Sequence, residues 1–283
     1  MSNQLVGSST LVATQRGPTG VSEGLENALL ATLPIYKTPS ESLWRACELN
    51  VYRKVRFESP ILEIGCADGS FSSLIFDRVD DAIDINPRSV ARYLKVHGKG
   101  GIFRRVHCMD ARRMTFADST YRTIFANCVI EHIPELDGVL ADSFRALAPG
   151  GRFITTVPLR RMSEHLLFRS ERYARYRQDA LIHTNLHTEG EWIDRFREAG
   201  FTSFETSPYI SSRTCRLWDT LDAPIGLGWG RYRLSVALRM IDAILPAGLR
   251  RYAHQKVAAV LAARIDTNID EADACAMLLI ARK

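Results

Sequence analysis

The sequence predicts an α/β fold in which a doubly wound, mainly parallel sheet of seven strands carries helices on both faces. Short apolar segments alternate with helix-like segments through the middle of the chain, an order typical of parallel strands joined by helices. Breaker residues separate these segments: the turn Pro149-Gly150-Gly151 is expected to end a helix at 137–148 and to start the next strand. The strand-like segments lie near 60–65, 81–85, 103–108, 123–128, 152–157, 202–210 and 274–283.

Composition indicates an ordinary soluble globular protein. The chain has 283 residues, 46% of them apolar and 24% charged, which is enough for one large core with a modest appendage. No apolar run approaches the roughly 20 residues that span a bilayer, and no secretory signal is evident. The six cysteines form no CxxC pair, which favours reduced thiols and a cytoplasmic setting over disulfides or a zinc site.

Four regions are expected along the chain. They are a flexible N-terminal segment (1–38), a core (39–211), a helical insertion before the last strand (212–265) and the closing strand of the core (266–283). The core opens with a predicted helix at 39–55, capped by Ser40 or Ser42. Within the insertion, two segments with helical apolar spacing, 234–245 and 256–265, are separated by Pro246-Ala247-Gly248.

The most informative segment runs from Ile61 to Phe71, where a short apolar strand enters a turn of small residues and a helix-like segment, SFSSLIF, follows. A dinucleotide fingerprint requires Gly at the first, third and sixth positions, but from Gly65 this loop offers Gly, Ala and Ser. Asp68 would also repel phosphate oxygens. The alternative is the acid-x-Gly-x-Gly-x-Gly loop of S-adenosylmethionine (SAM) enzymes, whose cofactor carries an ammonium and a sulfonium. It is matched by Glu63-x-Gly65-x-Ala67-x-Gly69.

Further motifs follow this loop: DAIDINP, HCMDARRMTF, FANCVIEHI, LAPGGRFITTVP and EWIDRFREAGF. In order and spacing the set resembles the class I SAM-dependent methyltransferases of small-molecule type (methyltransferase type 11-like), over roughly residues 40–210 and the last strand. The resemblance implies a Rossmann-like fold with an antiparallel seventh strand and an N-terminal helical lid over the cofactor pocket. Tyr36 and Trp44 would be walls of that pocket, or Trp44 would simply pack the lid on the sheet.

The resemblance also implies which residues bind SAM and its product S-adenosylhomocysteine. Backbone contacts would come from the loop, ribose contacts from the acid after the second strand, and adenine contacts from the Asp-Ala pair after the third. The implied residues are Glu63, Gly65, Cys66, Asp68, Gly69, Asp84, Ile85, Asp110, Ala111 and Asn127. Ala67 stands where the family has its middle glycine, and it fits without strain if its φ is negative.

Three histidines are candidate general bases for the acceptor. His132 follows the fourth strand, beside the expected methyl position, and His183 and His187 lie in the loop before a helix that begins near Glu189. The two loop histidines are four apart, but Asn185 and Leu186 supply no third ligand, so no metal is expected.

The acceptor is predicted to be a small molecule, first a hydroxyl oxygen of a natural-product, sugar or lipid-linked biosynthetic intermediate. N- or C-methylation and a catalytically silent SAM-fold binding protein remain alternatives. Nucleic acid is not expected as a partner, because the chain has no aromatic-plus-basic stripe and residues 127–130 read Asn-Cys-Val-Ile rather than an Asn/Asp-Pro-Pro-Tyr signature. The oligomeric state is not predicted.

Basic residues are concentrated in the insertion. Residues 216–264 hold eight Lys/Arg and three Asp, 8 − 3 = +5, which equals the net charge of the whole chain. Arginines facing inward would indicate an anionic acceptor, which they could grip in bidentate fashion. Arginines facing outward would allow contact with an acidic membrane surface, or would be only the solvated face of packed helices.

Overall fold

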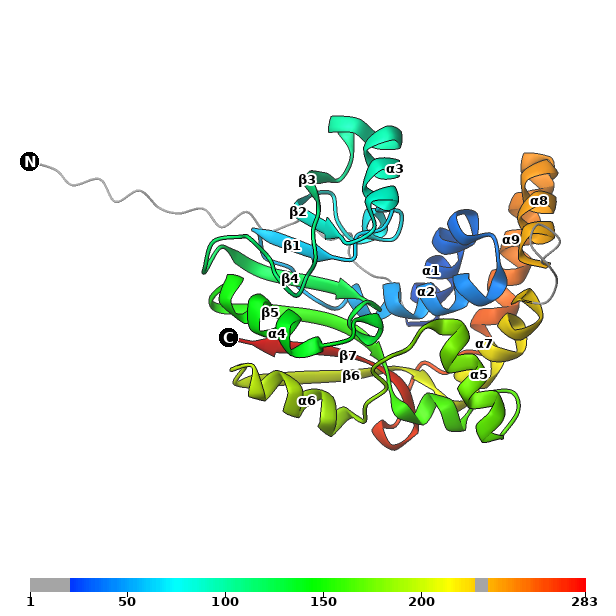
Figure 1. The fold of residues 1–283 in the computed structure, drawn as a ribbon. Coiled ribbons are helices and arrows are strands. Elements are labelled where there is room, and N and C mark those ends of the chain that lie inside the picture. The colour runs from blue at the N-terminus through cyan, green and yellow to red at the C-terminus, as the bar shows by residue number, and fades with distance from the viewer. Residues whose placement is uncertain (1–20, 227–233) are drawn as a thin grey trace, which may run out of the picture.

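The computed structural model describes residues 21–226 and 234–283, and its centre is a seven-stranded sheet (Figure 1). The strand order is β3-β2-β1-β4-β5-β7-β6. Strand β7 is antiparallel to β5 and to β6, while the β3-β2-β1-β4-β5 neighbours pair in parallel. The predicted doubly wound sheet with an antiparallel closing strand is therefore confirmed.

The strands lie close to the predicted segments, with one difference at the fifth. Their bounds are β1 Ile61–Ile64, β2 Val79–Asp84, β3 Phe103–Cys108, β4 Tyr121–Asn127, β5 Leu147–Pro158, β6 Ser203–Ser211 and β7 Ala274–Arg282. The helix before β5 ends at Ala146, so the predicted turn at 149–151 lies inside β5. The pairing of β5 with β4 shifts register there, and Gly150 has a φ of 71°, which shows that the turn residues form an irregularity in a strand.

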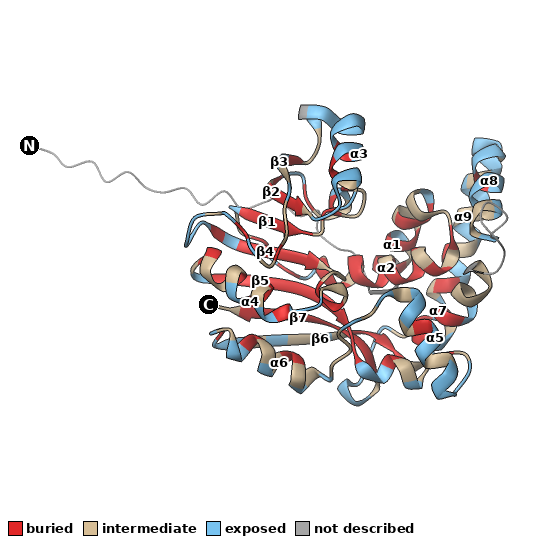
Figure 2. Ribbon diagram, viewed as in Figure 1, coloured by how far each residue is buried: buried red, intermediate tan, exposed pale blue. Residues whose placement is uncertain are grey.

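Helices cover both faces of the sheet. Their bounds are α1 Val21–Tyr36, α2 Pro39–Tyr52, α3 Pro87–His97, α4 Leu136–Ala146, α5 Glu171–Leu181, α6 Glu189–Glu198, α7 Ser212–Asp222, α8 Leu234–Ile244 and α9 Ala247–Ala262. One cluster of buried residues joins the sheet to α4 and α6, and the other joins it to α1, α2, α3, α7 and α9. Figure 2 colours the buried residues red. Helices α1, α2, α5, α7, α8 and α9 gather beyond the end of the sheet to which β1, β4 and β5 point (Figure 1).

The N-terminal region differs from the prediction. Residues 21–36, expected to belong to a flexible segment, form helix α1, whose Leu25, Leu29 and Leu33 are buried. Residues 1–20 lie outside the described part of the chain. The cap of α2 is Thr38 rather than either predicted serine, because Ser40 and Ser42 lie buried inside the helix.

Two further helix predictions need correction. The segment SFSSLIF contains only one 3-10 turn, Ser72–Leu74, so no α-helix follows the first loop. In the insertion, α9 begins at Ala247 directly after Pro246, which makes it longer than the predicted helix at 256–265. None of the described helices is long and apolar enough to cross a membrane.

Candidate active site

The carboxyl ends of β1, β2, β3 and β4 lie side by side and bring four predicted residues to one edge of the sheet. The Gly65 N–H donates to the Ile83 carbonyl (2.8 Å), and the Met109 N–H donates to the Asp84 carbonyl (3.1 Å). The loops after β1 and β3 thus each begin with a hydrogen bond to a carbonyl of β2. Gly65, Asp84, Asp110 and Asn127 consequently share one edge, where ligands bind in open α/β sheets.

The loop after β1 depends on backbone conformations that favour glycine. Gly65 and Gly69 have φ values of 74° and 72°, and a Cβ on Gly65 would lie 2.5 Å from a Val129 methyl group. Ala67, expected at negative φ, has a φ of 46°, so the prediction that it fits without strain is wrong. This conformation points the Ala67 N–H at Asp84 Oδ2, 3.0 Å away, which holds the loop against β2.

Asp84 retains accepting capacity after binding this loop. Its two oxygens accept from the N–H groups of Ala67 (3.0 Å) and Asn86 (2.8 Å). A carboxylate has about four lone-pair sites, so two remain for a pair of vicinal hydroxyls. The neighbouring Ile85 side chain is 64% exposed and offers an apolar surface beside the carboxylate.

Asp110 is held in its ionised form by an arginine two residues later. Arg112 Nη2 lies 2.8 Å from Asp110 Oδ2, and hydrogen bonds from Arg112 lower the pKa of this carboxyl. Asp110 can therefore act only as an acceptor towards a ligand amine, as the adenine assignment requires. The adjoining Ala111 is buried.

Glu63 and Asp68 serve the loop itself. Glu63 is buried beneath it, where Oε1 accepts from Ser72 Oγ (2.5 Å), and burial raises the pKa of this carboxyl to about 8. The Glu63 side chain is thus neutral at neutral pH and supports the loop from the core. Asp68 is half-buried and accepts from the Ser70 N–H (3.1 Å). The thiol of Cys66 is also buried, which leaves its backbone as the part that could reach a ligand.

The side chain of Asn127 is engaged by Glu48, a residue that the sequence analysis did not single out. Glu48 on α2 is fully buried and accepts from Asn127 Nδ2 (3.0 Å) and Cys128 Sγ (2.8 Å). On its own helix it also accepts from Trp44 Nε1 (2.9 Å) and Arg45 Nη1 (2.7 Å). This carboxylate therefore ties the N-terminal lid to the end of β4. The sequence signal that could have identified Glu48 was an acidic residue on the apolar face of the predicted helix at 39–55.

A cleft of about 660 Å³ opens next to these strand ends, on the side of β4 and β5. Its lining comes from α2, from the residues after β4 and β5, from α5, and from the insertion. The insertion residues in the lining are Trp218, Asp222, Ile225, Ser235 and Arg239. Trp44 is also in the lining and packs edge-on against Trp218, with ring centroids 5.0 Å apart. Trp44 thus forms a wall of this cleft.

Two of the three predicted histidines meet in the cleft. The N–H groups of Thr184 and Asn185 both donate to the Glu131 carbonyl (2.9 Å each), which holds the loop after α5 against the end of β4. His132 and His183 consequently lie with ring centroids 5.2 Å apart. His187 lies elsewhere: its ring packs against Trp192 and is absent from the cleft lining.

The hydrogen bond of His132 fixes which ring nitrogen is free. Nδ1 lies 3.0 Å from the Ile182 carbonyl oxygen, which can only accept, so Nδ1 carries the hydrogen. The neutral ring then keeps an unprotonated Nε2, 3.7 Å from Glu131 Oε1. Burial, with a smaller contribution from His132, lowers the pKa of His183 to about 4, so His183 is neutral at neutral pH.

Glu131 completes this group. It is 1% exposed, its Oε2 has no hydrogen-bond partner, and burial raises its pKa to about 8. One ligand atom from each of Glu131, His132 and His183 lies within 4.8 Å of the others, so the three could also hold a metal ion. His187, whose spacing from His183 could suggest a metal site in the sequence, is not part of this group.

The arginines that line the cleft are all paired with acids. Arg45 pairs with Glu48 (2.7 Å), and Arg239 pairs with Glu41 (3.1 Å). Arg177, which is buried, pairs with Asp219 and Asp222 (2.7 Å each) and lies over the Trp218 ring. The described part of the cleft therefore presents no unpaired guanidinium to an acceptor.

The sequence matches the family described as "Methyltransferase domain" over residues 39–206. This stretch is more than half of the chain and contains every strand end described above. The chain belongs to this methyltransferase family. It is a class I SAM-dependent methyltransferase, as its motifs predicted. No curated protein matches the sequence.

Solved structures share the fold at low sequence identity. A SAM-dependent methyltransferase from Thermotoga maritima aligns with a TM-score of 0.50 at 14% identity, covering 93% of this chain and 91% of that one. Phosphoethanolamine N-methyltransferase 2 from Haemonchus contortus, in complex with SAM, aligns at 0.55 and 16% identity and covers 94% and 60%. The same enzyme with S-adenosylhomocysteine aligns at 0.55 and 15% identity and covers 94% and 61%. The methyltransferase thus spans about three fifths of the length of that enzyme.

The strand-end residues of the methyltransferase fit SAM. Asp84 keeps two acceptor sites, as many as the two hydroxyls of a ribose require, and the exposed Ile85 offers an apolar surface of the kind that an adenine ring can cover. Only one 3-10 turn, Ser72–Leu74, follows the loop, so it offers no α-helix N-terminus of the kind that binds a pyrophosphate. This difference favours SAM over a dinucleotide.

Proposed function

We propose that the methyltransferase methylates a hydroxyl oxygen of an uncharged small molecule bound in the 660 Å³ cleft, with His132 as general base. The observation that carries this proposal is the hydrogen bond from His132 Nδ1 to the Ile182 carbonyl, since it leaves Nε2 free to accept a proton. A hydroxyl is a weak nucleophile until that proton is removed.

SAM, when bound, supplies a methyl group already activated by the sulfonium. The protein therefore has to align the acceptor, exclude water and take up a proton. Trp44, Met162 and Trp218 give the cleft an apolar wall that can orient an acceptor. The neutral His183 beside His132 adds no positive charge to the group at neutral pH, which leaves His132 as the proton acceptor.

The nature of the cleft argues for an uncharged acceptor. An anionic acceptor was the prediction if the arginines of the insertion faced inward. Among the described basic residues of 216–264, only Arg239 lines the cleft, and Glu41 neutralises it. Arg231 and Arg233, also counted in that prediction, lie outside the described residues.

A panel of small molecules tests this proposal. Alcohols and phenols, each with its amine counterpart, would be incubated with the enzyme and SAM, and products would be detected by mass spectrometry as a gain of one CH₂. Methylated alcohols or phenols without methylated amines support the proposal. Methylation of amines alone would replace it with N-methylation. SAM binding with no product from a broad panel would favour the silent binding protein.

A further inference from the structure

The hairpin of α8 and α9 exposes large apolar side chains to solvent. Of the thirteen exposed large apolar residues in the described chain, seven lie between 234 and 260. These seven are Leu234, Met240, Ile241, Ile244, Leu249, Tyr252 and Val260. Ile244, beside the link between the helices, is 78% exposed. Single exposed apolar side chains are ordinary, whereas a group of this kind indicates a surface that another body covers.

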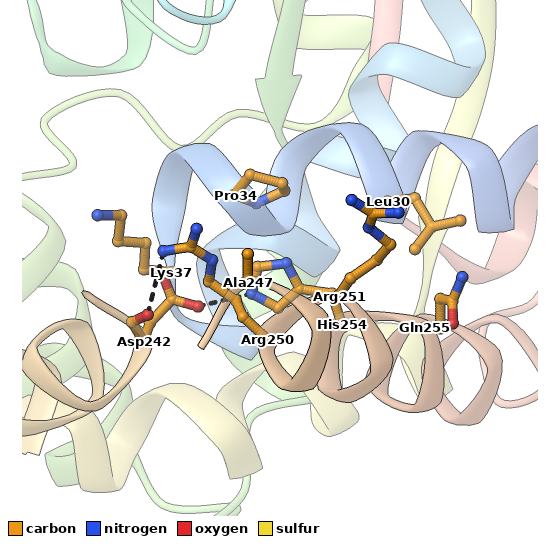
Figure 3. Close-up of a pocket in the computed structure, with 9 residues that line it drawn as sticks. All are labelled: Leu30, Pro34, Lys37, Asp242, Ala247, Arg250, Arg251, His254 and Gln255. Carbon is orange, nitrogen blue, oxygen red and sulfur yellow. Dashed lines mark hydrogen bonds and ion pairs between the residues drawn. The ribbon is translucent and has the colours of Figure 1, made fainter. Parts of the chain in front are cut away.

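A basic pocket of about 570 Å³ lies beside this apolar surface, between α1 and α9 (Figure 3). Its lining consists of Leu30, Pro34, Lys37, Asp242, Ala247, Arg250, Arg251, His254 and Gln255. Lys37, Arg250 and Arg251 carry a fixed positive charge, and Asp242 is the one acidic residue of the lining. Along α9 the two arginines, Arg250 and Arg251, are flanked by the exposed Leu249 and Tyr252, so cationic and apolar side chains lie within one turn of the helix.

The cations of the basic pocket differ from those of the acceptor cleft in their pairing. The carboxylate of Asp242 is engaged by His254 Nε2 (2.7 Å), and Arg250 reaches only the Asp242 backbone carbonyl (3.4 Å) (Figure 3). Lys37 and Arg251 form no ion pair with any described residue. The basic pocket therefore keeps positive charge available for an anion from outside the chain.

We propose that the α8–α9 hairpin docks the enzyme on an anionic phospholipid bilayer. The apolar residues beside the link, with Ile244 and Leu249 foremost, enter the interface, and the basic pocket receives a lipid phosphate. Positive charge selects this occupant over a second copy of the chain, whose equivalent surface would bring like charges together. The proposal does not depend on the acceptor proposed above.

Helix length indicates that the contact is peripheral. Helix α8 has 11 residues, which corresponds to about 16 Å. That length is about half the hydrocarbon thickness of a bilayer. Helix α8 can therefore lie in the membrane interface but is too short to span the bilayer.

Vesicle co-sedimentation of the full-length protein tests the proposal. Binding is expected to vesicles of phosphatidylcholine mixed with phosphatidylglycerol, and not to vesicles of phosphatidylcholine alone. High salt should release most of the bound protein. Soluble glycerol phosphate should fail to displace it, because that molecule offers the phosphate without the apolar interface. Displacement by glycerol phosphate would reduce the proposal to a site for a free anion and so overturn it.

Variants separate the two parts of the surface. The double variant Arg250→Gln/Arg251→Gln should bind mixed vesicles roughly tenfold or more weakly, and Ile244→Ser/Leu249→Ser should weaken binding by a similar factor. The matched control is Arg264→Gln, an exposed arginine just beyond the far end of α9, which should bind like wild type. Unchanged SAM affinity in all three confirms that each is folded.

Two results would overturn the proposal. One is equal binding of wild type and the Arg250→Gln/Arg251→Gln variant to mixed vesicles. The other is a wild-type protein that ignores the vesicles but dimerises in sedimentation velocity, with the dimer lost in Ile244→Ser/Leu249→Ser. That second result would assign the apolar surface to a second copy of the chain.

Discussion

The cofactor side and the acceptor side of this active site are built by different means. On the expected cofactor side, at the ends of β1, β2 and β3, the contacts join residues that are close in the sequence, such as the Ala67 N–H and the Asp84 side chain, 17 residues apart. On the acceptor side, at the ends of β4 and β5, side chains reach across the fold. Glu48 binds Asn127 over 79 residues, and His132 binds the Ile182 carbonyl over 50. The first side thus depends on contacts over short sequence separations and the second on the packing of distant segments, so we expect that the two can be altered independently.

The largest expected effect is on the acceptor side. His132→Ala should lower turnover by about a hundredfold or more, because the proton of the acceptor hydroxyl loses its base. SAM affinity should stay near wild type, since the residues expected to bind the ribose and the adenine, Asp84 and Asp110, follow other strands. Turnover on an acceptor found in the panel and calorimetry with SAM measure the two quantities separately.

His187→Ala is the matched control for that variant. His187 packs against Trp192 outside the cleft, so its loss should leave turnover at saturating acceptor nearly unchanged. Equal losses in both variants would show that the effect is structural. Wild-type turnover in His132→Ala would show that transfer proceeds by proximity alone. Turnover that a chelator abolishes and a divalent cation restores would instead assign Glu131, His132 and His183 to a metal.

The converse variant, Asp84→Asn, should weaken SAM binding by roughly a hundredfold while sparing turnover at saturating SAM. The substitution keeps the shape of the side chain but removes the charge and one acceptor oxygen, and hydrogen bonds to a charged group contribute about 1.5–3 kcal/mol each. Calorimetry gives the affinity. If the variant binds SAM as tightly as wild type, Asp84 does not contribute to SAM binding. If the variant loses turnover at saturating SAM, the cofactor side and the acceptor side do not act independently.

This difference also explains what the sequence could predict. The strand–loop residues from Gly65 to Asp110 follow from local motifs, and the structure places them at neighbouring strand ends. An acid on the apolar face of a predicted helix was a local signal for Glu48, but its partner Asn127 and the meeting of His132 with His183 depend on contacts between distant segments, which no local pattern specifies. The left-handed Ala67 was missed for a related reason. Its conformation is set by the hydrogen bond to Asp84 and not by the preference of alanine.

Stability as a function of pH tests the buried acids on the two sides. Burial raises the pKa of both Glu63 and Glu131 to about 8, above an unfolded value of 4.5. The stabilisation from each is therefore complete below about pH 4.5 and is lost as the pH rises through about 8. Glu131→Gln should flatten the decline over this range by up to about 1.4 kcal/mol per pH unit, the limit for one proton. Urea unfolding at several pH values measures it.

Glu63→Gln is the matched comparison. It should flatten the same stability curve, because its carboxyl is shifted by the same cause. Only Glu131→Gln should also change the dependence of turnover on pH, because Glu131 Oε1 lies 3.7 Å from His132 Nε2. If Glu63→Gln changed that profile equally, the separation of the two sides would fail.

The smallest expected effect is a change in the free energy of unfolding, and its sign should differ between the two sides. Ala67 and Cys128 have nearly the same left-handed φ, 46° and 47°, one on each side. Ala67→Gly should raise the free energy of unfolding by up to about 1 kcal/mol, since relief of the left-handed strain exceeds the added freedom of the unfolded chain. Cys128→Gly relieves the same strain but removes the thiol that donates to the buried Glu48 (2.8 Å), so it should lower that free energy. Urea unfolding of the two variants decides the matter. Two increases would contradict this prediction, because they would show that relief of the left-handed strain outweighs the hydrogen bond of the Cys128 thiol.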